Sequence, residues 1–169
     1  MMNLPPLAAP WPYFGSKRRC ARAIWRRIGD VPNMVEPFAG SLAVLLARPH
    51  PPQRETANDI DCVIVNTWRA IRGDPEAVAH HADWIVSEAD LHARHLYLVN
   101  GGKALAERCR WDPDFYDARV AGWFIYGAAL WIGSGWCSGT GPHKLPPEAG
   151  EAPGAGVPLQ LPHLAHGDL

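Results

Sequence analysis

A glycine turn between two apolar segments is the first place in this chain where residue types suggest chemistry. In VEPFAGSLAVLLARP, residues 35–49, an apolar stretch ends near Phe38, the turn follows at Gly40, and apolar residues return at helical spacing from Leu42. A strand, a glycine turn and a helix in this order open a nucleotide-binding crevice, because glycine lets a ligand approach the backbone beyond the strand. The simpler alternative is a tight connection that holds no ligand.

A carboxylate follows this turn at a suggestive separation. Asp59 lies about twenty residues after Gly40, at the end of the next predicted strand. An acidic side chain at that position accepts hydrogen bonds from both hydroxyls of a ribose, and Ile60 beside it offers an apolar face to adenine. The turn and the carboxylate together favour a nucleotide site over a simple connection.

Positive charge gathers at the start of the chain, although the net charge is only -1. Six lysines and arginines fall within residues 1–30, Arg18 and Arg19 among them, against the single acidic residue Asp30. Such a segment suits contact with phosphates. The alternative is the solvated face of a helix.

The hydrophobic pattern alternates between helix and strand over the first 73 residues, which predicts a β-α-β core. Ser16 is expected to cap the first helix and Gly29 to end it, whereas Ser41 caps the second and Pro49 ends it. The expected segments are a helix from Ser16, a strand over 33–38, a helix over 42–47, a strand over 55–60 and a helix over 63–72.

Only helices are predicted beyond residue 73. Asp74 and Asp112 each precede a proline that suits the first helical position, and Ser87 begins a segment that resembles a capping box. The last of these helices is apolar on nearly all sides and is therefore expected to be buried. The expected helices cover 75–86, 88–99, 102–109 and 113–132.

Three motifs in this order resemble those of the Dam-like, D12 class DNA adenine-N6 methyltransferases of bacteria and phages, which are often found in restriction systems. The motifs are PYFGSK at 12–17, VEPFAGSLAV at 35–44 and ANDID at 57–61. In that family they bind S-adenosylmethionine, whose methyl group passes to an adenine flipped out of double-stranded DNA. The resemblance therefore implies an S-adenosylmethionine-dependent transferase that acts on DNA.

Carried onto this sequence, the resemblance implies one cofactor site built by three segments. Tyr13 and Lys17 would line its methionine side, and Asp59 and Ile60 would hold the ribose and the adenine. Glu36 at its strand end would meet the cationic end of the cofactor, and a capping or salt-bridging carboxylate is the alternative. The turn around the cofactor would consist of Glu36, Pro37, Phe38, Ala39 and Gly40.

Aromatic and basic residues of the helical segment suit recognition of the DNA target. Trp111 and Arg119 could stack on nucleotides or clamp them. The stretch WIGSGWCSGTGPH, residues 131–143, resembles a loop that precedes the catalytic strand in phage-type members. Core packing is the alternative for the aromatic residues, and it is favoured for Trp123, Phe124, Tyr126 and Trp131.

The family's catalytic motif, a polar residue followed by Pro-Pro and an aromatic residue, does not occur in this sequence. The residues that follow its Pro-Pro pairs are Leu7, Gln53 and Glu148. In the family this motif holds the flipped adenine by its N6 amino group. We therefore assign no catalytic residue and expect the chain to stop before the catalytic strand and to be inactive alone. Leu42 also stands where many members have a second glycine, which predicts a different methionine-side pocket.

Three interpretations compete. The first is the cofactor-binding and target-recognition part of a site-specific DNA adenine-N6 methyltransferase. The second is a non-catalytic module that binds S-adenosylmethionine or DNA, with a second polypeptide supplying the catalytic part. The third is a helical interaction protein without a nucleotide ligand, which would make the three aligned motifs a coincidence.

The expected fold is α/β: a partial Rossmann-like S-adenosylmethionine-dependent methyltransferase core with a helical insertion, helix-rich overall. Residues 1–73 would form the cofactor-binding β-α-β portion, residues 74–141 the helical target-recognition segment, and the Pro/Gly-rich residues 142–169 a disordered tail. The cysteines are widely spaced, and His92 and His95 have no third ligand nearby, so no metal site is expected. We expect a cytoplasmic protein, because no segment resembles a signal peptide or a membrane span.

Overall fold

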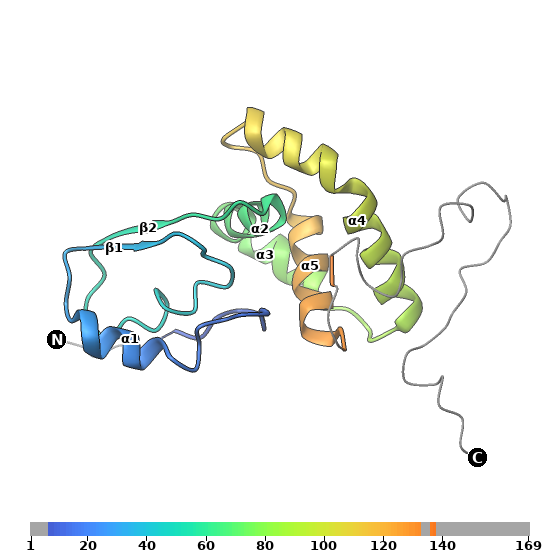
Figure 1. Ribbon diagram of the computed structural model, residues 1–169. Helices are drawn as coiled ribbons and strands as arrows, with labels where there is room; N and C mark the ends of the chain where they lie inside the picture. The colour runs from blue at the N-terminus through green and yellow to red at the C-terminus, as the bar shows by residue number, and fades with distance from the viewer. Residues whose placement is uncertain (1–6, 133–135, 138–169) are drawn as a thin grey trace, which may run out of the picture.

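The computed structural model describes residues 7–132, 136 and 137, which form two parts (Figure 1). Helix α1 and the strands β1 and β2 make the first part, and helices α2 to α5 make the second. The elements are α1 Ala21–Ile28, β1 Asn33–Glu36, β2 Arg54–Ala57, α2 Cys62–Gly73, α3 Pro75–Ala82, α4 Glu88–Trp111 and α5 Ala118–Leu130. The described chain is therefore helix-rich, with one small sheet.

The sheet consists of two parallel strands. β1 and β2 pair in a register that sets Asn33 opposite Arg54 and Glu36 opposite Ala57. Each strand is shorter than predicted, at four residues. Every residue of β2 is exposed, and in β1 only Glu36 is buried, so most of the sheet surface faces solvent within the described structure.

Residues 42–47 form successive turns, so the helix predicted here is wrong. Leu42 has a left-handed φ of 53°, which an α-helix does not accommodate. Side chains outside the segment also bond its backbone. The carbonyl of Val44 accepts a hydrogen bond from Trp25 Nε1 at 2.7 Å, and the N–H of Leu45 donates to a carboxylate of β1 at 3.1 Å. These tertiary hydrogen bonds favour turns over a regular helix.

Neither serine predicted to cap the first two helices does so. Helix α1 begins at Ala21, and Ser16 lies within turns that precede it. The Ser16 hydroxyl accepts a long hydrogen bond of 3.4 Å from the Arg18 N–H. The Ser41 hydroxyl is buried and has no partner within the described residues. Gly29 ends α1 at a positive φ of 70°, as the sequence predicted.

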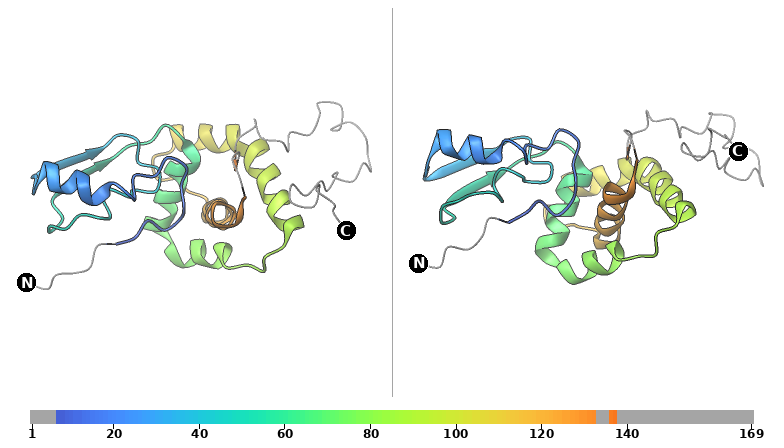
Figure 2. Two further views of the ribbon diagram at one scale, coloured as in Figure 1. Left: turned by 60° about the horizontal axis from the view of Figure 1, so that its bottom comes forward. Right: turned by 90° about the horizontal axis from the view of Figure 1, so that it is seen from below.

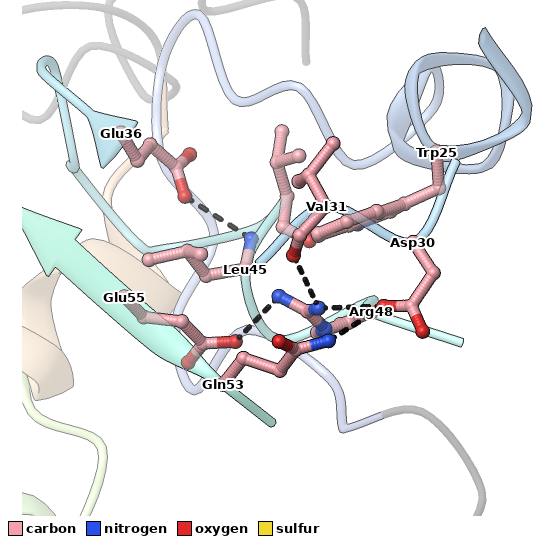
Figure 3. Close-up of polar contacts among 9 residues, drawn as sticks. Trp25, Asp30, Val31, Glu36, Leu45, Arg48, Gln53 and Glu55 are labelled. Atoms are coloured by element: carbon pink, nitrogen blue, oxygen red, sulfur yellow. Dashed lines mark hydrogen bonds and ion pairs between the residues drawn. The ribbon is translucent and has the colours of Figure 1, made fainter. Parts of the chain in front are cut away.

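A buried arginine ties α1, the turn segment and β2 together. Arg48 Nη2 lies 2.9 Å from both Asp30 Oδ1 and the carbonyl of Val31, and Nη1 lies 3.3 Å from Glu55 Oε1 (Figure 3). Its guanidinium carbon also lies 5.0 Å from the ring centroid of Trp25. These partners matter because removing an unpaired charge from water costs several kcal/mol. Arg48 therefore fixes how the segment after the glycine turn packs against the sheet.

Helix α5 occupies the centre of the helical part. The left view of Figure 2 looks nearly along it, with α2, α3 and α4 around it, and it packs against all three. Its burial was predicted from its apolar surface, and Phe124 and Tyr126 are each 4% exposed. The main core cluster consists of Trp11, Ile64, Leu98, Val120 and Phe124.

The starts of α3 and α4 agree with the local sequence, whereas the start of α5 does not. The side chains of Asp74 and Ser87 cap α3 and α4, as predicted. Asp112 does not begin α5, which starts later with Asp117 as its cap. The side chain of Asn66 holds this start, because it accepts a hydrogen bond from the N–H of Asp117 at 2.7 Å and donates to its carbonyl at 3.0 Å. A contact from α2 therefore decides where α5 begins.

Helix α4 continues through Gly101 and Gly102, where the sequence predicted a break between two helices. Glycine destabilises a helix interior by about 1 kcal/mol relative to alanine. Burial of Leu98 and Cys109 on either side of the pair offsets this cost.

The tail predicted over 142–169 lies outside the described residues, as do 138–141. Within the described part of the chain, no helix combines the length and apolar character that crossing a membrane requires.

Candidate functional site

The side chains of Tyr13, Asp59 and Trp68 meet the backbone of Gly40 at the glycine turn. A Cβ atom built on Gly40 would lie 2.7 Å from ring atoms Cδ1 and Cε1 of Tyr13. The Gly40 N–H donates to Asp59 Oδ2 at 2.8 Å, and its carbonyl accepts from Trp68 Nε1 at 2.8 Å. Gly40 also has a φ of 48°. The two residues on which the nucleotide prediction depended most, Gly40 and Asp59, are therefore in direct contact.

Asn58 joins the ends of the two strands. Its N–H donates to the carbonyl of Glu36 at 3.0 Å, and its carbonyl accepts from the N–H of Ala39 at 2.8 Å. Its side-chain amide donates to the carbonyl of Pro37 at 3.1 Å. Sequence reasoning missed both Asn58 and Trp68. The position of Asn58 inside the ANDID motif could have identified it, whereas Trp68 shares the spacing of the core residues of α2 and gave no such sign.

Asp59 stabilises the turn and still has acceptor capacity. Its Oδ2 accepts from Gly40, and its Oδ1 accepts from the N–H of Asp61 at 3.0 Å. Each oxygen of an ionised carboxylate can accept a second hydrogen bond. The side chain is half-buried, so it is accessible from solvent. Asp59 can therefore hold Gly40 and accept hydrogen bonds from a pair of hydroxyl groups at the same time.

The surroundings of Tyr13 are acidic. Burial, followed by the negative charges of Asp59 and Asp61, raises the pKa of Tyr13, so its phenol stays neutral and can donate a hydrogen bond. Lys17 is exposed, and its Nζ donates to the carbonyl of Gly15 at 2.6 Å. The carboxylates near the turn favour a ligand with a positive charge.

Glu36 is the buried carboxylate of this site, with 9% of its surface exposed. Its Oε2 accepts a hydrogen bond from the N–H of Leu45 at 3.1 Å (Figure 3). Burial raises the pKa of Glu36, while the N–H groups of Leu45 and Val44 and the charge of Lys17 oppose the rise. Glu36 therefore has the capping contact that was the alternative to a cofactor ligand. Its contact with a cofactor stays a prediction.

We expect ionisation of Glu36 to reduce stability as the pH rises. A carboxyl group with a raised pKa binds more protons in the folded chain than in the unfolded chain, so stability falls between the ordinary and the raised pKa. Glu36→Gln removes this titration and keeps an oxygen that can accept from Leu45. Urea unfolding from about pH 4 to about pH 7 should show the stability of this variant rising relative to that of the wild type as the pH rises.

The matched control for this prediction is Glu107→Gln. Glu107 is an exposed carboxylate of α4, and its replacement should leave the shape of the wild-type pH profile unchanged. Parallel profiles for Glu36→Gln and the wild type would contradict the prediction.

The remaining turn residues differ in exposure. Ala39 is buried, whereas Phe38 is 86% exposed and Ile60 is 89% exposed. Pro37 is also exposed. Phe38 and Ile60 follow adjacent parallel strands, so both lie at the same edge of the sheet and present apolar surface to solvent. Such surface suits the faces of a planar base.

The residues predicted to contact DNA lie on different elements. Arg18 and Arg19 are exposed in the turns before α1. Trp111 ends α4 and is 87% exposed. Arg119 lies in the first turn of α5 and lines a cleft with aromatic side chains, including Trp123. Trp111 does not line that cleft, so the structure does not bring it together with Arg119 there.

The histidines of α4 contact aromatic rings. His95 is buried and stacks on Trp131, with ring centroids 4.7 Å apart, and the ring centroid of His92 lies 5.8 Å from that of Trp131. Across residues 7–132, 136 and 137, no group of three His, Cys, Asp or Glu side chains is placed to hold a metal ion.

Comparison with known proteins identifies one family. No curated protein and no solved structure matches the chain. A family model described as D12 class N6 adenine-specific DNA methyltransferase matches residues 13–104, more than half of the 169 residues. The matched range begins at Tyr13 and includes the glycine turn and Asp59, the groups that meet in the structure. This chain therefore belongs to the D12 class of N6 adenine-specific DNA methyltransferases.

Proposed function

We propose that this chain binds S-adenosylmethionine at the Gly40 turn and provides the cofactor-binding and target-recognition parts of a site-specific DNA adenine-N6 methyltransferase. One observation carries the proposal: the 2.8 Å hydrogen bond between the Gly40 N–H and Asp59 Oδ2. This bond holds Asp59, the residue predicted to bind the ribose, beside the turn that a nucleotide would approach. Family membership supports the reaction class.

The residues at the turn suit the chemical groups of this cofactor. Bound S-adenosylmethionine supplies a sulfonium methyl group for transfer to the N6 nitrogen of adenine. Asp59 accepts hydrogen bonds from the ribose hydroxyls, while Phe38 and Ile60 flank the adenine with their exposed apolar surfaces. Tyr13 donates from its neutral phenol on the methionine side, with Lys17 near the carboxylate end. The negative charge of the neighbouring carboxylates attracts the cationic cofactor.

We further propose a division of labour along the chain. Residues 1–73 form a partial Rossmann-like core for the cofactor, and residues 74–141 form the target-recognition segment for double-stranded DNA, with Arg18 and Arg19 contacting phosphates. Trp11 of the first segment packs against Phe124 of the second, with ring centroids 5.6 Å apart, and against Trp68 of its own segment at 5.0 Å. This packing supports a fixed orientation of the cofactor turn relative to the helices.

A second candidate function is a non-catalytic module that binds S-adenosylmethionine or DNA. The absence of a Pro-Pro-aromatic motif from the sequence favours it, because that motif positions the adenine in the family. Both candidates include the cofactor site, so cofactor binding tests what they share and methyl transfer separates them.

Equilibrium titration of labelled S-adenosylmethionine into the whole chain tests the shared site. We expect saturable binding that S-adenosylhomocysteine competes away and that ATP does not, because three phosphates would meet the carboxylates near the turn. Absence of saturable binding by a folded chain would overturn the cofactor proposal. Methyl incorporation into adenine-containing duplex DNA should be undetectable with this chain alone, and a clear signal would show that catalytic residues lie within it.

A further inference from the structure

A second candidate site lies in the helical part of the molecule. Helices α3, α4 and α5 and the segment that joins α3 to α4 line an open cleft of about 560 Å³. Its walls include Trp84, Arg94, Tyr97, Arg119 and Trp123. None of the residues that meet at the Gly40 turn lines it, so the cleft is separate from the candidate cofactor site.

A buried, incompletely paired arginine lines the cleft. Arg94 is 8% exposed, and its guanidinium carbon lies 4.1 Å from the ring centroid of Tyr126, 5.6 Å from Trp84 and 5.7 Å from Trp123. Its Nη1 has no hydrogen-bond partner, and no carboxylate oxygen lies within 4.0 Å of its guanidinium, among the described residues. Cation–π contacts offset part of the desolvation of this charge but provide no acceptor for its N–H groups. An anionic oxygen would complete the site.

The guanidinium of a second arginine also lines the cleft. Arg119 is exposed, and its guanidinium carbon lies 5.1 Å from the ring centroid of Trp123 and 5.6 Å from that of Tyr97. Its Nη2 donates to the hydroxyl of Tyr97 at 3.3 Å, which holds the guanidinium over the rings. Asp90 is the acidic residue among those lining the cleft, and its Oδ2 accepts from Trp84 Nε1 at 3.3 Å. Two arginines against one carboxylate leave the cleft positively charged.

Aromatic surface faces the same space. Trp84 is 53% exposed and Tyr97 is 44% exposed, so both rings can accept a planar group from solvent. Stacking on aromatic rings tolerates any base, whereas arginines bind phosphate oxygens strongly. A nucleotide combines the two chemistries that this cleft offers.

We propose that the cleft between α3, α4 and α5 binds a nucleotide, with the base stacked on Trp84 or Tyr97 and the phosphate held by Arg119 and Arg94. The nucleotide can be free or part of a DNA strand. The proposal rests on the proposed function only in taking DNA as the substrate. The cleft lies in the predicted target-recognition segment, so this proposal gives that segment a specific nucleotide contact that the sequence did not define.

Binding of dTMP and of single-stranded (dT)12 to the whole chain, in the presence of saturating S-adenosylhomocysteine, tests this proposal. The probes contain thymine, and S-adenosylhomocysteine occupies the proposed cofactor site, so the adenosine pocket of that site does not contribute to the measured binding. We expect Arg119→Gln to weaken binding of the oligonucleotide about tenfold. The slope of the logarithm of the association constant against the logarithm of the salt concentration should also become shallower by about one. The exposed arginine of the matched control Arg72→Gln lies on α2 outside the cleft, so this variant should bind within about twofold of the wild type.

Further measurements separate the ligand sources and the two proposals. Arg119-dependent binding of dTMP supports a free nucleotide as a ligand, and dependence seen only with (dT)12 supports a DNA strand. Trp84→Leu should also weaken binding, because it removes the stacking surface. S-adenosylmethionine binding should be unchanged in Arg119→Gln. If neither the wild type nor this variant binds S-adenosylmethionine, the cofactor site is rejected and the cleft proposal still stands. Equal binding by wild type, Arg119→Gln and Trp84→Leu, or thymidine binding as tightly as dTMP, would overturn the cleft proposal.

Discussion

Asp59→Ala is expected to weaken S-adenosylmethionine binding about 100-fold. The proposed ribose contacts are two charge-assisted hydrogen bonds, each worth about 1.5–3 kcal/mol. The lower bounds of the two bonds add to about 3 kcal/mol, which corresponds to about two factors of ten in the dissociation constant. The variant also leaves the Gly40 N–H without its acceptor, which loosens the turn. Titration with labelled cofactor measures the effect.

Two control variants separate ligand contact from a loosened turn. Asp59→Asn keeps one side-chain oxygen as an acceptor for Gly40 and removes the charge, so we expect an intermediate loss of about tenfold. Asp114→Ala removes an exposed carboxylate outside the site and should bind like the wild type. If Asp59→Ala and the wild type bind the cofactor equally well, the ribose assignment is wrong.

Gly40→Ala is expected to destabilise the protein by about 2–5 kcal/mol. Its φ of 48° lies in the left-handed region, where alanine is disfavoured by about 1–2 kcal/mol. Its Cβ would lie 2.7 Å from two ring atoms of Tyr13, and such overpacking costs about 1–3 kcal/mol. Urea unfolding should therefore show a lower midpoint, and cofactor binding should weaken because the turn is displaced.

A double-mutant cycle isolates the steric part of this effect. Gly40→Ala combined with Tyr13→Ala removes the ring that the new methyl group meets, so the two substitutions together should cost less than the sum of their separate effects. Gly102→Ala is the matched control, because no atom lies within 4 Å of its Cβ position in α4 and alanine favours the helix. It should be at least as stable as the wild type. Additive effects at Gly40 and Tyr13 would show that the ring contact does not constrain the turn.

Local sequence predicted the features that a few neighbouring residues decide. The caps at Asp74 and Ser87 and the stop at Gly29 lie where expected, because each depends on a side chain and backbone groups within one helical turn. The order of the first two strands was also correct, although both strands are short.

The errors occur where distant residues compete for the same backbone groups. Helical spacing over 42–47 predicted a helix, but Trp25 and Glu36 bond its backbone and the segment forms turns. The start of α5 moved to Asp117 because Asn66 holds it. The spacing of apolar residues within a short segment cannot predict these contacts, because the partner residues lie outside that segment.

The sequence by itself determined the family, because the aromatic, turn and acidic motifs and their spacing are properties of the chain order. It also predicted which residues would bind a cationic nucleoside, and that prediction awaits the binding experiments above. Only the tertiary structure decided that Gly40 bonds Asp59, that Glu36 caps a turn, and that Arg94 lies buried among rings in the cleft that Arg119 also lines. The physical reason is that hydrogen-bond partners and burial depend on which segments meet, and here the meeting segments are far apart along the chain.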